Sequence, residues 1–158
     1  MALGPAIGVT EGTPTMFDLS IQLGFHLKGR ASGFGFGLLT EVMPGEAGTA
    51  YEFGGLVVWD IQPLERYGFY ITPGVALGYF GFTAKDDGGD SSSPTVSVAA
   101  KGLTLHIMLE LKLSLADRGM IFLRAGGMDL LLASSSSSSS SSGTAIWFKA
   151  LAGGGITF

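Results

Sequence analysis

The chain has 158 residues, enough for a single domain over residues 1–158, and only 14% of them are charged, against about 25% in soluble globular domains. It contains no cysteine, which excludes disulfide bonds and thiolate metal sites, and its formal net charge of -4 without a basic stripe argues against nucleic-acid binding. Although 46% of the residues are hydrophobic, no apolar run approaches the roughly 18 residues of a membrane-spanning helix.

Eight segments alternate between apolar and polar or small residues, which is the period of a β-strand. Phe17–Leu27 alternates without a break, and Leu103–Leu115 keeps Leu or Ile at every odd position while Glu110 and Lys112 fall on the other side. This test predicts strands over 2–10, 16–28, 32–42, 51–61, 68–83, 95–115, 119–133 and 144–158. In the sixth segment Val96 and Val98 have the opposite parity from the leucines, which predicts a β-bulge near residues 99–102.

The connections between these segments fall into two alternating classes. Short connections are expected at 29–31, 62–67 and 116–118, and longer ones at 11–15, 43–50, 84–94 and 134–143. Short turns at one end and longer loops at the other are typical of a transmembrane β-barrel. Two of the longer connections, Lys85–Pro94 and the nine serines Ser134–Ser142, are read as a solvated acidic loop and a flexible linker.

The residues on the two faces of the strands indicate which face contacts lipid. Lipid cannot hydrogen-bond to backbone groups, so a sheet crosses it only when closed, and an eight-stranded barrel has a narrow interior. Leucine rows would overfill that interior, whereas the glycine-rich opposite face suits it. We therefore predict an all-β fold, an eight-stranded antiparallel up-and-down transmembrane β-barrel with leucines facing lipid. The alternatives are a soluble lipocalin-like carrier with leucines lining its pocket, and a designed or edited barrel, which the serine tract suggests.

Outward aromatic residues should gather in two girdles at the membrane interfaces. By parity and position, Trp59, Phe34 and Phe69 fall near the short-turn end. Tyr51 and Tyr79 fall near the long-loop end. This distribution supports the lipid-facing assignment.

Several charged residues are predicted to point into the lumen. A turn centred on Asp117 places Glu110 directly opposite Arg124, with Lys149 at a similar depth. Glu41 and Glu52 flank the 43–50 connection and should face each other across a hairpin. Two carboxylates directly opposite each other are destabilising unless a positive charge neutralises them. We expect Lys or Arg from across the lumen to supply that charge, with a bound cation as the alternative.

Neither histidine is expected to form a catalytic or metal site. His26 and His106 both point inward by parity, and no carboxylate is expected at matching depth to complete a metal site. No nucleophile lies within expected reach of a base. We predict lumen hydrogen bonding for both, with no catalytic residues, no metal and no cofactor.

The alternating strands, the segment Gly68–Phe82 and the terminal Phe158 together resemble the small eight-stranded outer-membrane proteins of Gram-negative bacteria. That family is typified by the membrane domain of OmpA, by OmpX and by OmpW. Its members end in an aromatic residue preceded by alternating apolar residues, which the barrel-assembly machinery reads, and Phe158 and Ile156 fit that pattern. The resemblance also implies that inward Glu–Arg pairs plug the lumen.

The resemblance implies an integral protein of the bacterial outer membrane, a monomer whose partners are the lipid bilayer and the assembly machinery. The function expected is structural, or interaction with extracellular partners through the longer loops, without enzymatic activity. The alternative is a porin-like narrow pore or channel for ions or small apolar solutes, as in OmpW-like transport.

Overall fold

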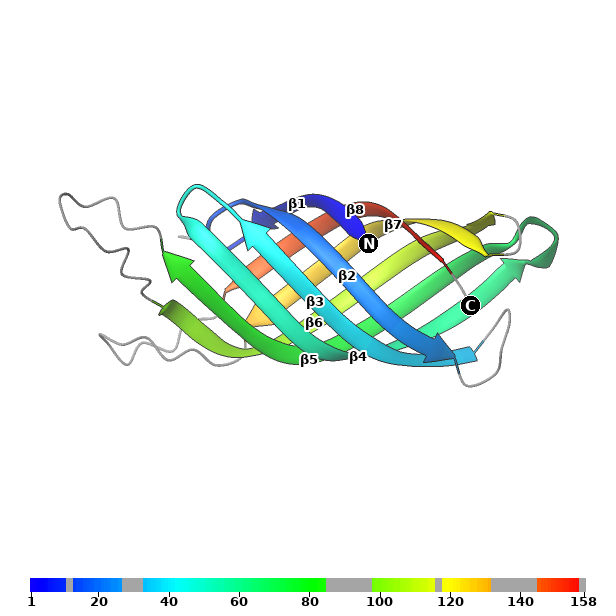
Figure 1. Ribbon diagram of the computed structural model, residues 1–158, viewed down its shortest axis with the longest axis horizontal. Coiled ribbons are helices and arrows are strands. Elements are labelled where there is room, and N and C mark those ends of the chain that lie inside the picture. The colour runs from blue at the N-terminus through cyan, green and yellow to red at the C-terminus, as the bar shows by residue number, and fades with distance from the viewer. Residues whose placement is uncertain (11–12, 27–32, 85–97, 116–117, 132–144, 157–158) are drawn as a thin grey trace.

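The computed structural model describes the chain except for residues 11–12, 27–32, 85–97, 116–117, 132–144 and 157–158 (Figure 1). The described part contains one short 3-10 helix, η1, and no helix long and apolar enough to cross a membrane. Its strands are β1 (Ala2–Gly8), β2 (Met16–His26), β3 (Gly33–Pro44), β4 (Gly48–Leu64), β5 (Phe69–Ala84), β6 (Val98–Leu115), β7 (Gly119–Leu131) and β8 (Ile146–Ile156), with η1 at Glu65–Tyr67.

Each strand pairs antiparallel with its neighbours in the chain, and β1 pairs with β8, so the sheet closes into a barrel. Figure 1 shows the strands running obliquely to the long axis of the barrel, as closure of a sheet requires. The prediction of an all-β, eight-stranded, antiparallel up-and-down barrel is confirmed.

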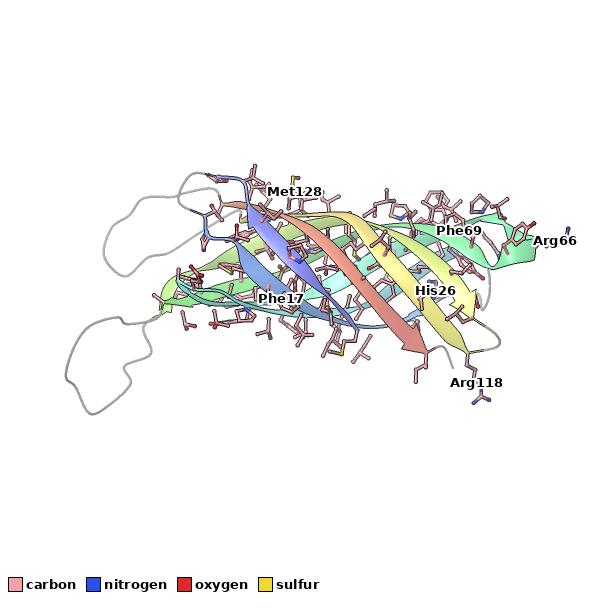
Figure 2. All side chains as sticks on the ribbon, turned by 90° about the horizontal axis from the view of Figure 1, so that it is seen from above. Phe17, His26, Arg66, Phe69, Arg118 and Met128 are labelled. Carbon is pink, nitrogen blue, oxygen red and sulfur yellow. The ribbon has the colours of Figure 1, made fainter. Side chains whose placement is uncertain are left out.

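Away from the bulges in β6 and β7, side chains alternate between the lumen and the outer surface. Ile107 on β6 is 43% exposed, while its neighbours His106 and Met108 are 0% and 3% exposed. The leucine rows point outward, and Figure 2 shows the apolar side chains of Phe17, Phe69 and Met128 on the outside of the barrel. This arrangement contradicts the alternative of a carrier whose leucines line an internal pocket.

The barrel stays narrow because glycines allow neighbouring strands to approach closely at inward positions. Gly54 on β4 lies directly opposite Gly78 on β5. A Cβ added at Gly54 would lie 2.8 Å from the Cα of Gly78 and 2.7 Å from the carbonyl oxygen of Leu77. Any larger residue at this pair would force the two strands apart.

A buried apolar layer fills the lumen toward the loop end. Most of its residues lie two positions from an inward charged residue on the same strand, on the side toward the loop end. The rings of Phe80 and Trp147 pack in this layer with their centroids 5.1 Å apart. The full cluster is Ala6, Met16, Met43, Ala50, Phe80 and Trp147.

The connection expected at residues 43–50 is not a longer loop, so this prediction was wrong. β3 continues through Pro44 and β4 begins at Gly48, with Met43 opposite Ala50 and Pro44 opposite Thr49. The Gly45 N–H donates to the Gly48 carbonyl oxygen at 2.8 Å, which closes a tight turn. The polar, glycine-rich sequence suggested a loop, but Met43 and Ala50 keep the alternation and are fully buried inside.

The predicted bulge in the sixth strand is confirmed. Phe82 lies opposite Ala100 and Thr83 opposite Val98, so Ala99 has no cross-strand partner on β5. A second bulge, which the sequence analysis did not predict, occurs in β7. There Arg124 lies opposite Leu151, but Gly127 lies opposite Lys149, so the inward parity changes between them.

Candidate functional site

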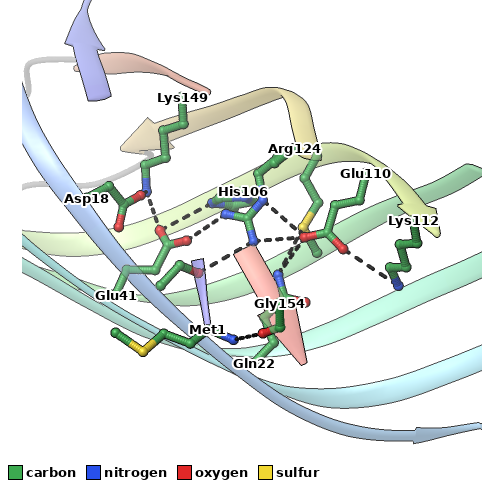
Figure 3. A network of polar contacts seen from close by, with 12 residues as sticks. Met1, Asp18, Gln22, Glu41, His106, Glu110, Lys112, Arg124, Lys149 and Gly154 are labelled. Carbon is green, nitrogen blue, oxygen red and sulfur yellow. Dashed lines mark hydrogen bonds and ion pairs between the residues drawn. The ribbon is translucent and has the colours of Figure 1, made fainter. Parts of the chain in front are cut away.

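The five charged residues predicted for the lumen all lie inside it, and each is at most 1% exposed. They come from five different strands, and Figure 3 shows four of them, Glu41, Glu110, Arg124 and Lys149, in one network with other inward side chains. The five are Glu41 on β3, Glu52 on β4, Glu110 on β6, Arg124 on β7 and Lys149 on β8.

Arg124 forms the first half of this network. It lies directly opposite Glu110 as predicted, and its Nε and Nη2 donate to Glu110 Oε1 at 3.2 and 3.1 Å. Its Nη1 donates to Glu41 Oε1 at 2.8 Å, so one guanidinium connects carboxylates on β6 and β3 across the lumen. Gln22 Nε2 also donates to Glu110 Oε1, at 2.9 Å.

Lys149 forms the second half. Its ammonium contacts Glu41 Oε2 and Asp129 Oδ2 closely, and it lies 3.2 Å from Asp18 Oδ2 and 4.0 Å from Glu52 Oε2. Glu41 therefore joins the two halves, since one of its oxygens faces Arg124 and the other faces Lys149.

Asp129 is the main residue that the sequence analysis missed. It is fully buried, contacts Lys149, and pairs closely with His106 Nδ1. Asp129 and Arg124 have opposite parity in the sequence, and only the β7 bulge turns both inward. The glycine pair Gly126–Gly127 between two charged residues of opposite parity was the available signal for that bulge.

The prediction that Glu41 and Glu52 face each other across β3 and β4 is confirmed. Glu41 is neutralised by Arg124 and Lys149, as expected. Glu52 is less well satisfied, because Thr104 donates to its Oε1 at 2.8 Å but its Oε2 has no hydrogen-bond partner. The nearest ammonium to that oxygen is the one 4.0 Å away on Lys149.

The network holds more carboxylates than permanent cations. Five buried carboxylates, on Asp18, Glu41, Glu52, Glu110 and Asp129, face three cationic side chains, on Lys112, Arg124 and Lys149. His106 contacts Asp129 closely, and its Nδ1 lies 3.7 Å from Glu41 Oε2, so a protonated imidazole would supply a fourth positive charge.

Four residues of the network lie close enough to resemble a metal-ligand set. One ligand atom from each of Glu41, Glu52, His106 and Asp129 lies within 4.8 Å of the others. The expectation that no carboxylate matches the depth of His106 was therefore wrong, because the β7 bulge brings Asp129 to it. The Lys149 ammonium lies against all three of these carboxylates, so the chain itself provides a cation for the set.

His26 belongs to a smaller group nearer the short-turn end. Its Nε2 lies 2.8 Å from Asp60 Oδ2, and Lys112 Nζ lies 3.2 Å from Asp60 Oδ1. Thr72 also donates a close hydrogen bond to Asp60. Lys112 lies 3.6 Å from Glu110 and links this group to the central network. The prediction of lumen hydrogen bonding for His26 agrees with this placement.

The predicted outer aromatic residues lie on the outer surface. Phe34 and Trp59 stack with ring centroids 5.2 Å apart, and Tyr51 and Tyr79 are exposed nearer the other end of their strands. Phe69 is half-buried on the outside of β5. In the assembly-signal pair, Ile156 points outward and is 67% exposed, while Phe158 lies outside the described residues.

A scan of known protein families and searches of curated proteins and of solved structures find no match for this chain. A buried ion-pair network spans the lumen, and an apolar layer lies beside it. We call this ion-pair network the charged plug. Its members are Asp18, Glu41, Glu52, His106, Glu110, Arg124, Asp129 and Lys149.

Proposed function

We propose that this chain is an integral β-barrel protein of the bacterial outer membrane, with a lumen closed by the charged plug and a non-enzymatic, structural or interaction role. The observation that carries the proposal is the plug itself, in which Arg124 and Lys149 reach carboxylates on facing strands while both remain 0% exposed. Such a barrel exposes its loops to the surrounding solution and passes few ions or solutes through its lumen.

The outer surface supports the membrane location. Soluble monomers rarely expose continuous apolar patches larger than a few hundred Å². Here the outward rows of adjacent strands are mostly apolar, as at Val75 on β5, Ile107 on β6 and Met128 on β7, which lie side by side in register. Such a surface is stable in contact with lipid, and a closed barrel pairs the backbone N–H and C=O groups that lipid cannot hydrogen-bond.

The cost of opening the plug supports the closed lumen. Removing one partner from a buried ion pair costs about 3–5 kcal/mol, because the other charge is left without compensation. A hydrated ion passing Arg124 would have to separate it from Glu41 and Glu110 together. The rings of Phe80 and Trp147 add an apolar barrier toward the loop end.

We propose the longer connections expected at residues 84–94 and 134–143, which lie almost entirely outside the described residues, for extracellular contacts. We also propose that the protein is a monomer inserted by the barrel-assembly machinery. The tight β3–β4 turn removes one of the four longer loops expected at that end.

A gated narrow pore is the second candidate, and the surroundings of Lys149 favour it. Its ammonium has four carboxylates within 4.0 Å, on Asp18, Glu41, Glu52 and Asp129. Lys149 can therefore exchange one partner for another without entering an uncompensated position. Such an exchange would loosen the contact at Glu41 and open a path for small ions.

Single-channel recording in planar bilayers separates the two candidates. The closed barrel predicts no steady current for the wild-type protein, and a new current in Arg124→Met, which removes the charge bridging β3 and β6. Arg118→Met, an exposed arginine beyond the plug, is the matched control and should stay silent. A steady wild-type current that Arg124→Met alters and Arg118→Met leaves unchanged would instead support the pore.

A further inference from the structure

Four side chains from four strands converge at one point of the charged plug, and each is at most 1% exposed. One ligand atom of each lies within 4.8 Å of the others. They are Glu41 on β3, Glu52 on β4, His106 on β6 and Asp129 on β7, which we call the four-residue set. Figure 3 shows Glu41 reaching His106 on one side and Lys149 on the other. Three carboxylates and one imidazole are a donor set that suits a divalent transition metal such as Zn²⁺.

Several atoms of the four-residue set lack hydrogen bonds within the described part of the chain. Glu52 Oε2, His106 Nδ1 and both carboxylate oxygens of Asp129 are buried and have no hydrogen-bond partner there. His106 Nδ1 and Asp129 Oδ1 are in close contact, yet neither donates a hydrogen bond to the other. Buried polar atoms are nearly always paired, so a group of unpaired ones at a single point indicates a position for an ion.

The buried charge points to the same kind of ligand. Among the described residues, five buried carboxylates face the three permanent cations Lys112, Arg124 and Lys149, so two negative charges are left over when His106 is neutral. A neutral imidazole is also the form that binds a metal. One divalent cation therefore balances the buried charge while His106 remains free to act as a ligand.

Lys149 supplies a positive charge to the four-residue set, and it has a second carboxylate to which it can move. Its ammonium lies 3.2 Å from Oδ2 of Asp18, which is fully buried and does not belong to the set. Neither oxygen of Asp18 has a hydrogen-bond partner among the described residues. Because a lysine side chain is flexible, rotation toward Asp18 would clear the set and keep the ammonium paired.

We infer that the four-residue set binds one divalent transition-metal ion of the zinc class, and that the Lys149 ammonium moves to Asp18 when the ion binds. A zinc ion holds its ligand atoms about 2.0–2.2 Å away, so two ligands lie at most about 4.4 Å apart, and the set needs only a small contraction. The ion links β3, β4, β6 and β7 across the lumen and strengthens the plug. The inference holds whether lipid or water surrounds the barrel, because all four ligands face the lumen.

Zinc binding by the full chain, folded in detergent, tests the inference. One sample is folded with Zn²⁺ present, and another is folded in EDTA, freed of the chelator and then titrated. Both routes are needed because the plug buries the set, so that an ion enters most easily while the strands assemble. Bound zinc is measured by competition with a chromophoric zinc indicator, and heat-modifiable gel migration reports folding. We expect one Zn²⁺ per barrel.

Two variants separate the ligands from the competing ammonium. Glu52→Gln removes one ligand at almost constant volume and should weaken Zn²⁺ binding at least about tenfold, since residues that only orient a metal ligand already contribute about 10–100-fold. Lys149→Met should tighten binding at least about tenfold, because it removes a like charge beside the ion. Glu46→Gln in the exposed turn and His26→Gln beside Asp60 are controls outside the set and should bind as wild type does.

Absence of bound zinc in both wild type and Lys149→Met, with the two proteins folded, would overturn the inference. Equal losses in Glu52→Gln and Glu46→Gln would also overturn it, as would a loss confined to His26→Gln, which would place the ion near the short-turn end. Weaker binding in folded Lys149→Met would overturn the assignment of its ammonium as the competing cation. If Lys149→Met does not fold, the comparison of wild type with Glu52→Gln decides alone, because that variant leaves both cations of the plug paired.

Discussion

Glu41 and Glu52 are the same residue type, directly opposite each other on neighbouring strands and equally buried, yet their surroundings predict opposite effects of neutralisation. Glu41 faces the guanidinium of Arg124 and the ammonium of Lys149. Glu52 has one hydrogen bond from Thr104 and one oxygen without a hydrogen-bond partner. The substitutions Glu41→Gln and Glu52→Gln therefore test the plug at almost constant side-chain volume.

Glu41→Gln should lower the free energy of unfolding by about 3 kcal/mol, because it removes the shared partner of two buried cations. We expect the lower end of the range for broken buried pairs, since Arg124 keeps Glu110 and Lys149 keeps Asp129. Glu52→Gln should be neutral or stabilising by up to about 1 kcal/mol, because it ends a like-charge opposition and its amide oxygen still accepts from Thr104.

The assay is reversible denaturant unfolding in detergent or liposomes, followed by tryptophan fluorescence and by heat-modifiable gel migration. Glu46→Gln, an exposed residue in the tight β3–β4 turn, controls for loss of one negative charge and should lie within about 0.5 kcal/mol of wild type. Equal destabilisation by Glu52→Gln and Glu41→Gln would show that the stability of the plug does not depend on these ion pairs.

Two further comparisons test the wall of the barrel. Gly54→Leu should lower the free energy of unfolding by several kcal/mol or prevent folding, because the leucine side chain would collide with the backbone of β5. Gly55→Leu should lower it by less than about 1 kcal/mol, because an added Cβ there meets nothing within 4 Å. Equal losses for the two variants in unfolding experiments would refute the close approach of β4 and β5. Ile107→Arg, midway along β6 and facing outward, should cost about 2–4 kcal/mol in a lipid bilayer, while Leu115→Arg at the strand end should cost about 0–1 kcal/mol. A similar, small cost for both arginines would argue that water surrounds the barrel.

The periodicity of the sequence was sufficient to predict the architecture and part of the plug. Alternation in segments such as Phe17–Leu27 fixes strand type and face, because a side chain in a strand has only two directions. The hairpin centred on residue 117 then fixes the partner of Glu110 by counting residues away from the turn. The like-charged pair Glu41–Glu52 followed from the same counting, although the connection between them proved to be a tight turn.

The features that were missed depend on local departures from that regularity. The β7 bulge near Ala125 reverses parity, so Asp129 could not be assigned to the lumen by counting. Contacts across the lumen, such as Lys149 with Glu41 and Asp18, depend on the tilt and stagger of the strands, which residue periodicity does not specify.

The position of the two tryptophans provides the most direct test that lipid surrounds this barrel. Trp59 points outward and is 49% exposed, whereas Trp147 is inside the lumen and 4% exposed. The variants Trp147→Phe and Trp59→Phe leave one tryptophan each, and each protein is reconstituted into vesicles containing brominated phospholipids. Lipid around the barrel predicts strong quenching of Trp59 by the lipid bromine and much weaker quenching of Trp147. Quenching of Trp59 by aqueous acrylamide but not by brominated lipid would contradict it.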